Sequence, residues 1–373
     1  MKIVYFTHSL LSCWNHGNAH FLRGVLRELS SLGHDVVTLE PAGNWSLSNL
    51  IADHGDAGLT AFRQAYPDLQ SRVYARVPEA LSHVADADLV IVHEWNDPAL
   101  VAAIGRARLR GGHFTLLFHD THHRAVSDPE AIHAFDLDGY DGVLAFGEAL
   151  RDVYRQWGWG SRVWTWHEAA DIRHFHPPAV EQARSSLVWI GNWGDGERTQ
   201  ELENFLFEPA RAAGLPLDIH GVRYPDEALR TLERYGVRYR GWAPNARAPE
   251  IFARHLATVH VPRRYYTTIL PGIPTIRVFE GLACGIPLVS APWDDSEHLF
   301  RVGQDFLMVP DGAAMTRALR ALASDADLRR DLVRHGLETI RARHTCAHRV
   351  QELLTIVSNL RETEAEQPQR SVA

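Results

Sequence analysis

Residues 277–290 read RVFEGLACGIPLVS, and this stretch decides the fold class of the chain. Prolines come just before it, a short helix is expected to begin near Thr275, and Gly285 marks the end of that helix. The apolar run at 287–290 predicts a strand directly afterwards. A short helix that leads into a buried strand is the repeating unit of proteins with parallel sheets, so an α/β fold is expected.

The same alternation of strands and helices continues on both sides of this stretch. Apolar residues at helical spacing over 19–32, followed by Gly33, predict a helix. Two alternating series are joined at 176–184, a segment that contains Pro177 and Pro178, so we expect two doubly wound domains. Strands are expected at residues 3–6, 35–39, 89–93, 113–118 and 142–146 in the first series, and at 187–190, 216–220, 238–239, 257–261 and 287–290 in the second.

The expected domain borders follow from these two series. The N-terminal domain covers residues 1–178, and the C-terminal domain covers residues 185–340. The helical pattern near the end of the chain predicts a last helix over 341–362. Residues 363–373 are rich in Glu, Gln and Ser and have little apolar content, so a disordered tail is expected there.

The composition of the 373 residues excludes several kinds of chemistry. Lys and Arg number 38 against 46 Asp and Glu, which gives a net charge of -8, so no broad surface for nucleic acid is expected. A local arginine pocket for a phosphorylated small molecule remains open. Lys2 is the only lysine and begins a predicted strand, which excludes Schiff-base, pyridoxal-phosphate and Walker A chemistry.

Cysteine usage and hydropathy together predict a cytoplasmic protein. Cys13, Cys284 and Cys346 lie far apart and form neither a CxxC pair nor a disulfide framework. The N-terminal run MKIVYFTHSLL is interpreted as a buried strand and not as a signal peptide. No apolar stretch reaches the roughly 18 residues that a transmembrane helix requires, so no transmembrane segment is expected.

Three polar clusters of the first domain follow predicted strands, the position where ligands bind in open α/β sheets. Residues 8–20 end with His20 at the start of a helix and suit an anionic or hydroxyl-rich ligand, although an ordinary loop is an equal interpretation. The other two clusters, residues 93–97 and 119–124, combine histidines with carboxylates, which can orient or deprotonate a sugar hydroxyl or else have a structural role. His119 and Asp120 belong to the second of them. The string HDTHH lacks a complete ligand set, so no metal site is expected.

Two further clusters belong to the second domain. Residues 191–198 read GNWGDGER, in which the glycines allow a phosphate to approach the backbone and Arg198 can pair with it. This order is not the dinucleotide fingerprint, so no redox cofactor is expected. Glu280 lies among apolar residues of the predicted helix and needs a partner. A ribose diol and an ion pair to Arg263, Arg264 or Arg277 are both open as that partner.

Several motifs resemble those of GT-B glycosyltransferases of group 1, and in particular the CgeB-type branch. VFEGLACGIPLVS resembles the E-x-x-A-x-G-x-P-V-V element of their second domain. SSLGHDVVTLE, HEAADIRHFHP, WIGNWGDGER and HTCAHRVQELL are similar to other elements of the family and occur in the same order over most of the chain. The resemblance implies two Rossmann-like domains that face each other across a cleft, with a terminal helix that returns to the first domain.

The resemblance also implies roles for particular residues. The first domain would hold the acceptor, and the second would hold a nucleotide-diphosphate sugar as co-substrate, without a further cofactor. Glu280 would bind the ribose, Asn192, Arg198 and Arg263 would neutralise the leaving diphosphate without a metal ion, and Tyr224 and Trp242 would meet the base. The full donor set is Glu280, Gly281, Arg277, Asn192, Trp193, Arg198, Arg263, Tyr224 and Trp242, and the catalytic candidates are His119, Asp120 and His20.

One departure from the family pattern concerns the donor. Many retaining members carry an E-x7-E pair, and this chain has Gly272 eight positions before Glu280. The missing glutamate leaves open the donor sugar, the retention of anomeric configuration, and whether activity is altered or lost.

The sequence therefore predicts a hexosyltransferase-type enzyme of the cytoplasm. It would transfer a sugar from a nucleotide sugar to a hydroxyl acceptor, which could be a saccharide, a lipid-linked molecule or a small molecule. Peripheral contact with a membrane stays open for a lipid-linked acceptor. The alternatives are a non-catalytic protein that binds nucleotide sugars or carbohydrates, and a sugar-nucleotide epimerase or hydrolase on the same fold.

Overall fold

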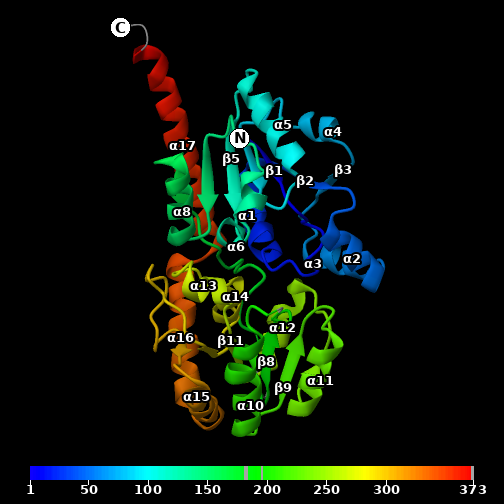
Figure 1. The fold of residues 1–373 in the computed structure, drawn as a ribbon, viewed down its shortest axis with the longest axis vertical. Helices are drawn as coiled ribbons and strands as arrows, with labels where there is room; N and C mark the ends of the chain where they lie inside the picture. The colour runs from blue at the N-terminus through cyan, green and yellow to red at the C-terminus, as the bar shows by residue number, and fades with distance from the viewer. Residues whose placement is uncertain (180–183, 195, 371–373) are drawn as a thin grey trace. The chain divides into compact units, whose positions relative to one another are not determined.

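The computed structural model describes residues 1–179, 184–194 and 196–370 (Figure 1). Contacts between residues divide the chain into two compact units. Each unit is built around its own parallel sheet, which confirms the predicted α/β class with two doubly wound parts. The first unit comprises Met1–Cys13, Phe21–Glu168 and Cys346–Ala373, and the second comprises Trp14–His20 and Ala169–Thr345.

Some predicted features lie outside the described residues. These are residues 180–183 of the predicted joining segment, Asp195 of the GNWGDGER motif and residues 371–373 of the predicted tail.

The first unit contains a sheet of seven parallel strands. Its strand order reverses between β1 and β4, so a ligand is expected at the carboxyl ends of these neighbouring strands. All five strands predicted for this series are present, whereas the sequence does not predict the short edge strands β3 and β7. In spatial order the strands are β3 (Arg72–Tyr74), β2 (Asp35–Pro41), β1 (Lys2–Phe6), β4 (Leu89–His93), β5 (Thr115–Asp120), β6 (Gly142–Ala145) and β7 (Val163–Thr165).

Helix α1 (Ala19–Ser31) shows how the apolar pattern of the sequence produces this unit. Phe21, Val25 and Leu29 repeat on one side of the helix and are fully buried. Gly33 follows the helix with a φ of 81°, a conformation that glycine adopts without strain. The other helices of this unit are α2 (Trp45–His54), α3 (Ala57–Ala65), α4 (Val77–Leu81), α5 (Pro98–Leu109), α6 (Arg124–Ser127), α7 (Pro129–His133), α8 (Glu148–Tyr154) and α17 (Cys346–Arg370), and a π-helical turn covers Arg155–Trp159.

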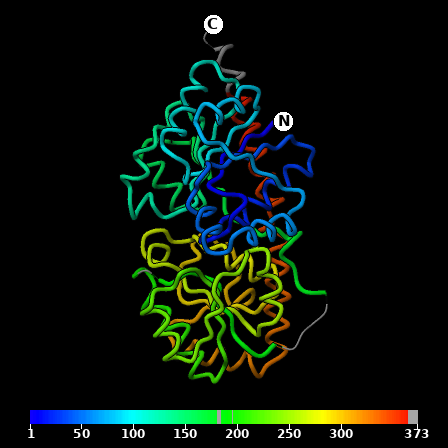
Figure 2. The backbone as a smooth tube through the Cα atoms, turned by 90° about the vertical axis from the view of Figure 1, so that its right-hand side faces the viewer, coloured from blue at the N-terminus to red at the C-terminus, as the bar shows by residue number. Residues whose placement is uncertain are grey.

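Helix α17, red in Figure 2, belongs to the first unit although it lies at the end of the chain. The indole Nε1 of Trp166 donates to the carbonyl of Arg349 over 2.8 Å, and Arg361 donates to the carbonyl of Asp88 over 2.7 Å. The sequence predicts disorder from residue 363, but the helix continues to Arg370. Glu, Gln and Arg are good helix formers, and extending an existing helix requires no new nucleation.

The second unit contains a sheet of six parallel strands. Its strand order reverses between β8 and β11, and the five strands predicted for this series are present. The two-residue strand β13 is not predicted by the sequence. In spatial order the strands are β10 (Arg238–Tyr239), β9 (Leu217–His220), β8 (Leu187–Ile190), β11 (Ala257–His260), β12 (Leu288–Ser290) and β13 (Leu307–Met308).

The helices of the second unit cover a core that includes Leu187, Phe207, Ile219 and Met315. Helix α14 begins at Ile276 and ends at Ala283, close to the helix that the stretch 277–290 predicts. The helices are α9 (Thr199–Leu202), α10 (Glu208–Ala213), α11 (Asp226–Tyr235), α12 (Ala248–Ala253), α13 (Arg264–Thr268), α14 (Ile276–Ala283), α15 (Gly312–Ser324) and α16 (Ala326–Arg343), with a π-helical turn at Glu203–Phe207 and a 3-10 turn at Asn245–Arg247.

A short segment from the N-terminal half, Trp14–His20, groups with the second unit. The Arg223 guanidinium lies 4.8 Å from the ring centroid of Trp14, and the ring of His20 stacks on Phe175 at 3.7 Å. The sequence instead places this segment in an N-terminal domain that ends at 178, because spacing along the chain carries no signal for these distant contacts.

The part of the chain that the structure describes contains no helix that is both long and apolar enough to cross a membrane.

Candidate functional site

The carboxyl edge of the second sheet brings together the loops that follow β8 and β11. Arg198 joins them: its guanidinium donates to the carbonyl of Val261 over 3.2 Å and to the carbonyl of Asn192 over 3.1 Å. Only 8% of Arg198 is exposed, and its guanidinium also lies over the ring of Trp189. Arg198 therefore places a guanidinium group at this edge of the sheet.

Arg263 adds a second guanidinium to the same edge. It forms an ion pair with Glu197 at 2.5 Å, and the backbone N–H of the next residue, Arg264, donates to the Glu197 carbonyl over 3.2 Å. The side chain of Arg264 pairs instead with Glu201 at 3.1 Å, and that pair is more exposed. Arg198 and Arg263 are therefore both fixed by neighbours within the two loops.

The glycines of the loop after β8 permit this packing. A Cβ atom at Gly194 would lie 2.5 Å from the backbone nitrogen of Thr199, and one at Gly191 would lie 2.7 Å from the Trp189 ring. Asn192, between them, accepts a hydrogen bond from the backbone N–H of Val222 over 3.3 Å and hydrogen-bonds Asn15. The loop is thus closely packed, and a side chain at either glycine would disturb it.

Glu280 lies on α14 and is fully buried. Its carboxylate accepts a hydrogen bond from Asn245 over 2.7 Å, hydrogen-bonds the Nδ1 atom of His20 at 3.0 Å and forms an ion pair with Arg277. Burial raises the pKa of Glu280, but Arg277 and His20 outweigh burial and lower the pKa to about 2. Glu280 is therefore ionised at neutral pH.

The sequence offers three arginines as ion-pair partners for Glu280, and in the structure Arg277 is the one that pairs with it. Arg263 and Arg264 pair with other carboxylates. A carboxylate has about four lone-pair sites, and the donors from Asn245, His20 and Arg277 use three of those of Glu280.

His20 uses both of its ring nitrogens. The Nε2 atom accepts a hydrogen bond from the backbone N–H of Asp171 over 2.7 Å, so Nδ1 carries the proton that is donated to Glu280. A general base needs a free lone pair, and in this arrangement His20 has none to offer. His20 thus lies beside Glu280 as a hydrogen-bond donor to its carboxylate.

Gly272 stands where the family pattern has its first glutamate, and the surrounding residues explain why a glycine fits. Its φ is 84°, and a Cβ atom there would lie 2.7 Å from Cγ of Glu297 and 2.8 Å from the hydroxyl of Ser296. The Gly272 N–H donates to the carbonyl of Asp294 over 2.7 Å. Any side chain at position 272 would displace Glu297.

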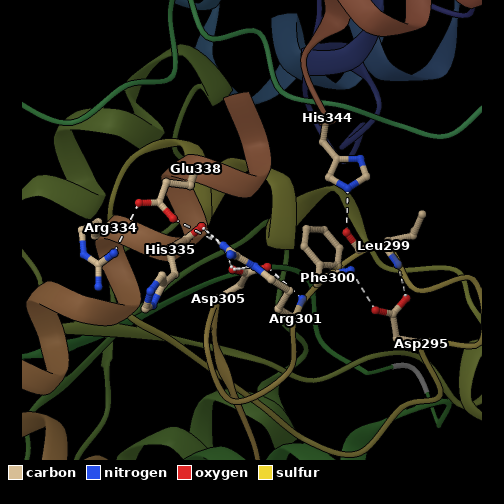
Figure 3. A network of polar contacts seen from close by, with 9 residues as sticks. All are labelled: Asp295, Leu299, Phe300, Arg301, Asp305, Arg334, His335, Glu338 and His344. Carbon is tan, nitrogen blue, oxygen red and sulfur yellow. Dashed lines mark hydrogen bonds and ion pairs between the residues drawn. The ribbon is translucent and has the colours of Figure 1, made fainter. Parts of the chain in front are cut away.

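The loop after β12, which carries Glu297, is held by a network of polar contacts (Figure 3). Asp295 accepts hydrogen bonds from the backbone N–H groups of Leu299 and Phe300, at 3.0 and 2.9 Å. The Nε2 atom of His344 hydrogen-bonds the carbonyl of Leu299 over 2.8 Å. Arg301 pairs with Asp305 at 2.7 Å and also reaches helix α16, so the loop has a defined shape.

The first unit holds the other two catalytic candidates, His119 and Asp120, at the end of β5. Both are fully buried. His119 hydrogen-bonds the Tyr5 hydroxyl at 2.6 Å, and burial lowers its pKa to about 3, so the ring is neutral. Asp120 accepts a hydrogen bond from the Tyr154 hydroxyl over 2.7 Å, while burial raises its pKa.

A second buried carboxyl, Glu94, lies beside Asp120. The sequence places it in the polar cluster at 93–97, although not among the three catalytic candidates. It forms an ion pair with Arg124, whose guanidinium also lies over the ring of Trp95 at 3.9 Å. Burial and the neighbouring charge of Asp120 raise the pKa of Glu94 despite Arg124. Two buried carboxyls with raised pKa values commonly mark functional sites. The sequence already indicates that this pair lies close together, because Glu94 follows β4 and Asp120 ends the neighbouring strand β5.

Of the remaining donor candidates, Trp193 and Tyr224 pack together with ring centroids 5.7 Å apart, whereas Gly281 and Trp242 lie elsewhere in the second unit. Trp193 belongs to the core and stacks on Phe207, and Gly281 faces the sheet, where a Cβ atom would lie 3.4 Å from Leu288. Tyr224 donates to the carbonyl of Gly191 over 2.8 Å. Trp242 lines a separate cavity beside α12.

The HDTHH string does not gather metal ligands. Its last histidine, His123, hydrogen-bonds Ser127 at 2.8 Å. Within residues 1–179, 184–194 and 196–370, no three His, Cys, Asp or Glu side chains are grouped so that they could hold a metal ion.

Comparisons with known proteins support the fold. Residues 198–355 match a family described as glycosyl transferase-like. Anabaena HepE in complex with UDP and glucose is 14% identical, with a TM-score of 0.68 over 96% of this chain and 99% of that chain. Sucrose-phosphate synthase from Thermosynechococcus elongatus is 15% identical, with a TM-score of 0.66 over 97% and 100% of the two chains.

An alpha-glucosyltransferase in complex with UDP is also similar in structure. It is 14% identical, with a TM-score of 0.68 over 96% of this chain and 100% of that chain. No curated protein matches the chain in sequence. The chain therefore has the GT-B fold found in glycosyltransferase structures, with a glycosyl transferase-like sequence over residues 198–355.

Proposed function

We propose that this protein is a glycosyltransferase that moves a sugar from a nucleotide-diphosphate sugar to a hydroxyl acceptor. The observation that carries the proposal is the match of residues 198–355 to the glycosyl transferase-like family, because that range includes Arg198, Arg263 and Glu280. The solved structures of the same fold include proteins in complex with UDP, which supports a uridine nucleotide as the first donor to test. A hexose as the transferred sugar, the CgeB-type branch and a cytoplasmic location belong to the same proposal.

In this proposal the donor lies at the carboxyl edge of the second sheet, where the strand order reverses between β8 and β11. Arg198 and Arg263 compensate the negative charge that develops on the leaving diphosphate, the task that a metal ion performs in other enzymes. Asn192 offers its amide from the same loop. Glu280 is ionised and accepts a hydrogen bond from a ribose hydroxyl at its remaining lone-pair site.

The acceptor hydroxyl must lose a proton during transfer. His119 has a pKa near 3, which makes it a weak base, and both nitrogens of His20 are occupied. Asp120, whose pKa burial raises, is the best matched of the three candidates to hold a proton near neutral pH. We therefore place proton transfer at the carboxyl edge of the first sheet, with Asp120 as its first candidate.

The donor assignment is tested by calorimetric titration of the protein with UDP-, GDP- and dTDP-sugars. We expect one of them to bind, and Glu280→Ala to weaken binding by about 1.5 to 3 kcal/mol, the usual contribution of a hydrogen bond to a charged group. Glu233→Ala, an exposed glutamate on α11, is the matched control and should bind as the wild type does.

The other outcomes separate the competing functions. Equal binding by wild type and Glu280→Ala would remove Glu280 from the donor site. Tight binding of a nucleotide sugar that is never consumed would favour a binding protein. Consumption of the nucleotide sugar without any acceptor would favour an epimerase or a hydrolase.

A further inference from the structure

A cavity of about 470 Å³ lies in the second unit, between the edge of its sheet and helix α12. This volume is within the range of pockets that hold small molecules. We call the cavity the β10 groove. The lining residues that matter here are Asp218, His220, Arg240, Trp242, Arg247 and Arg254.

Most of the proposed donor residues lie outside the β10 groove, but Trp242, which the resemblance sets against the base, lines it. The groove extends from the amino ends of β8 and β11, where Ser186 and His255 lie, to His220 at the carboxyl end of β9. Neither Arg198 nor Glu280 is among the described residues that line the groove.

Asp218 carries one of the two negative charges among the lining residues, and its hydrogen-bonding capacity is already used. Its carboxylate accepts two hydrogen bonds from Arg238, at 2.9 and 2.8 Å, and one from Nε of Arg240 at 2.7 Å. It also hydrogen-bonds Nε2 of His255 at 3.1 Å. Burial raises the pKa of Asp218, but these partners outweigh burial and lower it. Asp218 therefore has no capacity left for a further cation.

Three guanidinium groups line the groove, from Arg240, Arg247 and Arg254. Arg240 uses only its Nε on Asp218, which leaves its terminal N–H groups available. Arg247 approaches Glu250 at 3.4 Å in an exposed pair, which contributes little. The side chain of Arg254 has no partner in the part of the chain that the structure describes. The groove thus has more positive than negative groups, in a protein whose net charge is -8.

His220 adds a polar group to the β10 groove, and Trp242 adds a flat apolar surface. Burial, together with repulsion from His255, lowers the pKa of His220 to about 4, so this ring is neutral. Its Nδ1 atom is buried and has no hydrogen-bond partner among the described residues. The indole of Trp242 supplies an apolar face against which a small ring can pack.

We propose that the β10 groove binds a small phosphorylated molecule, whose phosphate contacts Arg240 and Arg254 and whose body packs against Trp242. The planar guanidinium fork matches two phosphate oxygens at once, which favours a phosphate over a neutral ligand. The neutral ring of His220 can hydrogen-bond a hydroxyl of the same molecule. This site does not depend on the proposed glycosyltransferase activity.

The test is calorimetric titration of the full chain with glucose 6-phosphate, glucose and inorganic phosphate. We expect glucose 6-phosphate to bind, inorganic phosphate to bind more weakly, and glucose not to bind. Arg254→Gln should weaken glucose 6-phosphate binding about tenfold or more, because one charged hydrogen-bonding group is removed. The melting temperature of Arg254→Gln should equal that of the wild type, since the Arg254 side chain forms no hydrogen bond or ion pair among the described residues. Arg230→Gln, on the exposed side of α11, is the matched control and should bind normally.

Several results would overturn the proposal. They are the absence of glucose 6-phosphate binding, unchanged binding by Arg254→Gln, and inorganic phosphate that binds as tightly as the hexose phosphate. Displacement of glucose 6-phosphate by UDP would assign the groove to the nucleotide sugar. Donor binding should be unchanged in Arg254→Gln and weakened in Glu280→Ala, so failure of one site is distinguishable from failure of the other.

Discussion

Glu280 is held in its ionised form by Arg277, Asn245 and His20, although it is fully buried. Its pKa falls from the ordinary value of 4.5 to about 2. A depressed carboxyl pKa contributes stability that is fully present above 4.5 and is lost as the pH falls towards 2. We expect the wild type to lose more unfolding free energy than Glu280→Gln over this interval, as measured by urea denaturation at a series of pH values. Parallel pH profiles would contradict the ionised carboxylate.

Gly272 is under a steric constraint that Gly303, a glycine of similar conformation, does not share. Gly272→Ala places a Cβ atom 2.7 Å from Glu297 at a positive φ, so we expect a loss of about 1 to 3 kcal/mol of unfolding free energy. Gly303 is the matched control, because its φ is 86° and a Cβ atom there would have no heavy atom within 4 Å. Gly303→Ala should lose less, because only backbone strain is added. Equal losses in chemical denaturation would show that Glu297 does not crowd position 272.

At the scale of elements, helix α17 completes the first unit through its buried face. Leu353 is fully buried, whereas Thr355 on the same helix is exposed. We expect Leu353→Ala to destabilise the protein by about 2 to 5 kcal/mol and Thr355→Ala to have little effect. Thermal denaturation measures both. Little change in Leu353→Ala would show that α17 is not packed against the first unit.

The elements also show how far the sequence predicts the fold. Helix α14 and most of the strands are predicted because each has a clear apolar run and a stop signal. The sequence does not predict the strands β3, β7 and β13, although it predicts β10, which is as short as β13. The end of α17 is missed because its last residues have little apolar content, a composition that predicts disorder, although several of them are Glu and Gln, which form helices well.

The candidate site is predicted less completely, because its contacts join distant parts of the chain. The sequence identifies Glu280 and offers Arg277 as one ion-pair partner, and the structure shows this ion pair. It does not predict the hydrogen bond to His20, 260 positions away. It also does not distinguish the core residue Trp193 from a ligand contact, since a loop tryptophan fits either place.

At the scale of the whole molecule, the cations are almost all arginines in a chain of net charge -8. In the proposed function, Arg198 and Arg263 stabilise the leaving diphosphate. We therefore expect EDTA to leave turnover of the donor unchanged, in an assay of nucleoside diphosphate release. Loss of turnover with EDTA and its recovery with added Mg²⁺ or Mn²⁺ would contradict this role of the two arginines.

The proposed glycosyl transfer is best tested by release of nucleoside diphosphate from a UDP-hexose, measured with and without a panel of hydroxyl acceptors. We predict release that depends on an acceptor, with a glycosylated product formed in equal amount, and a large loss of both in Glu280→Ala. Donor binding without any product from the panel, or equal turnover by wild type and Glu280→Ala, would contradict the proposed transfer.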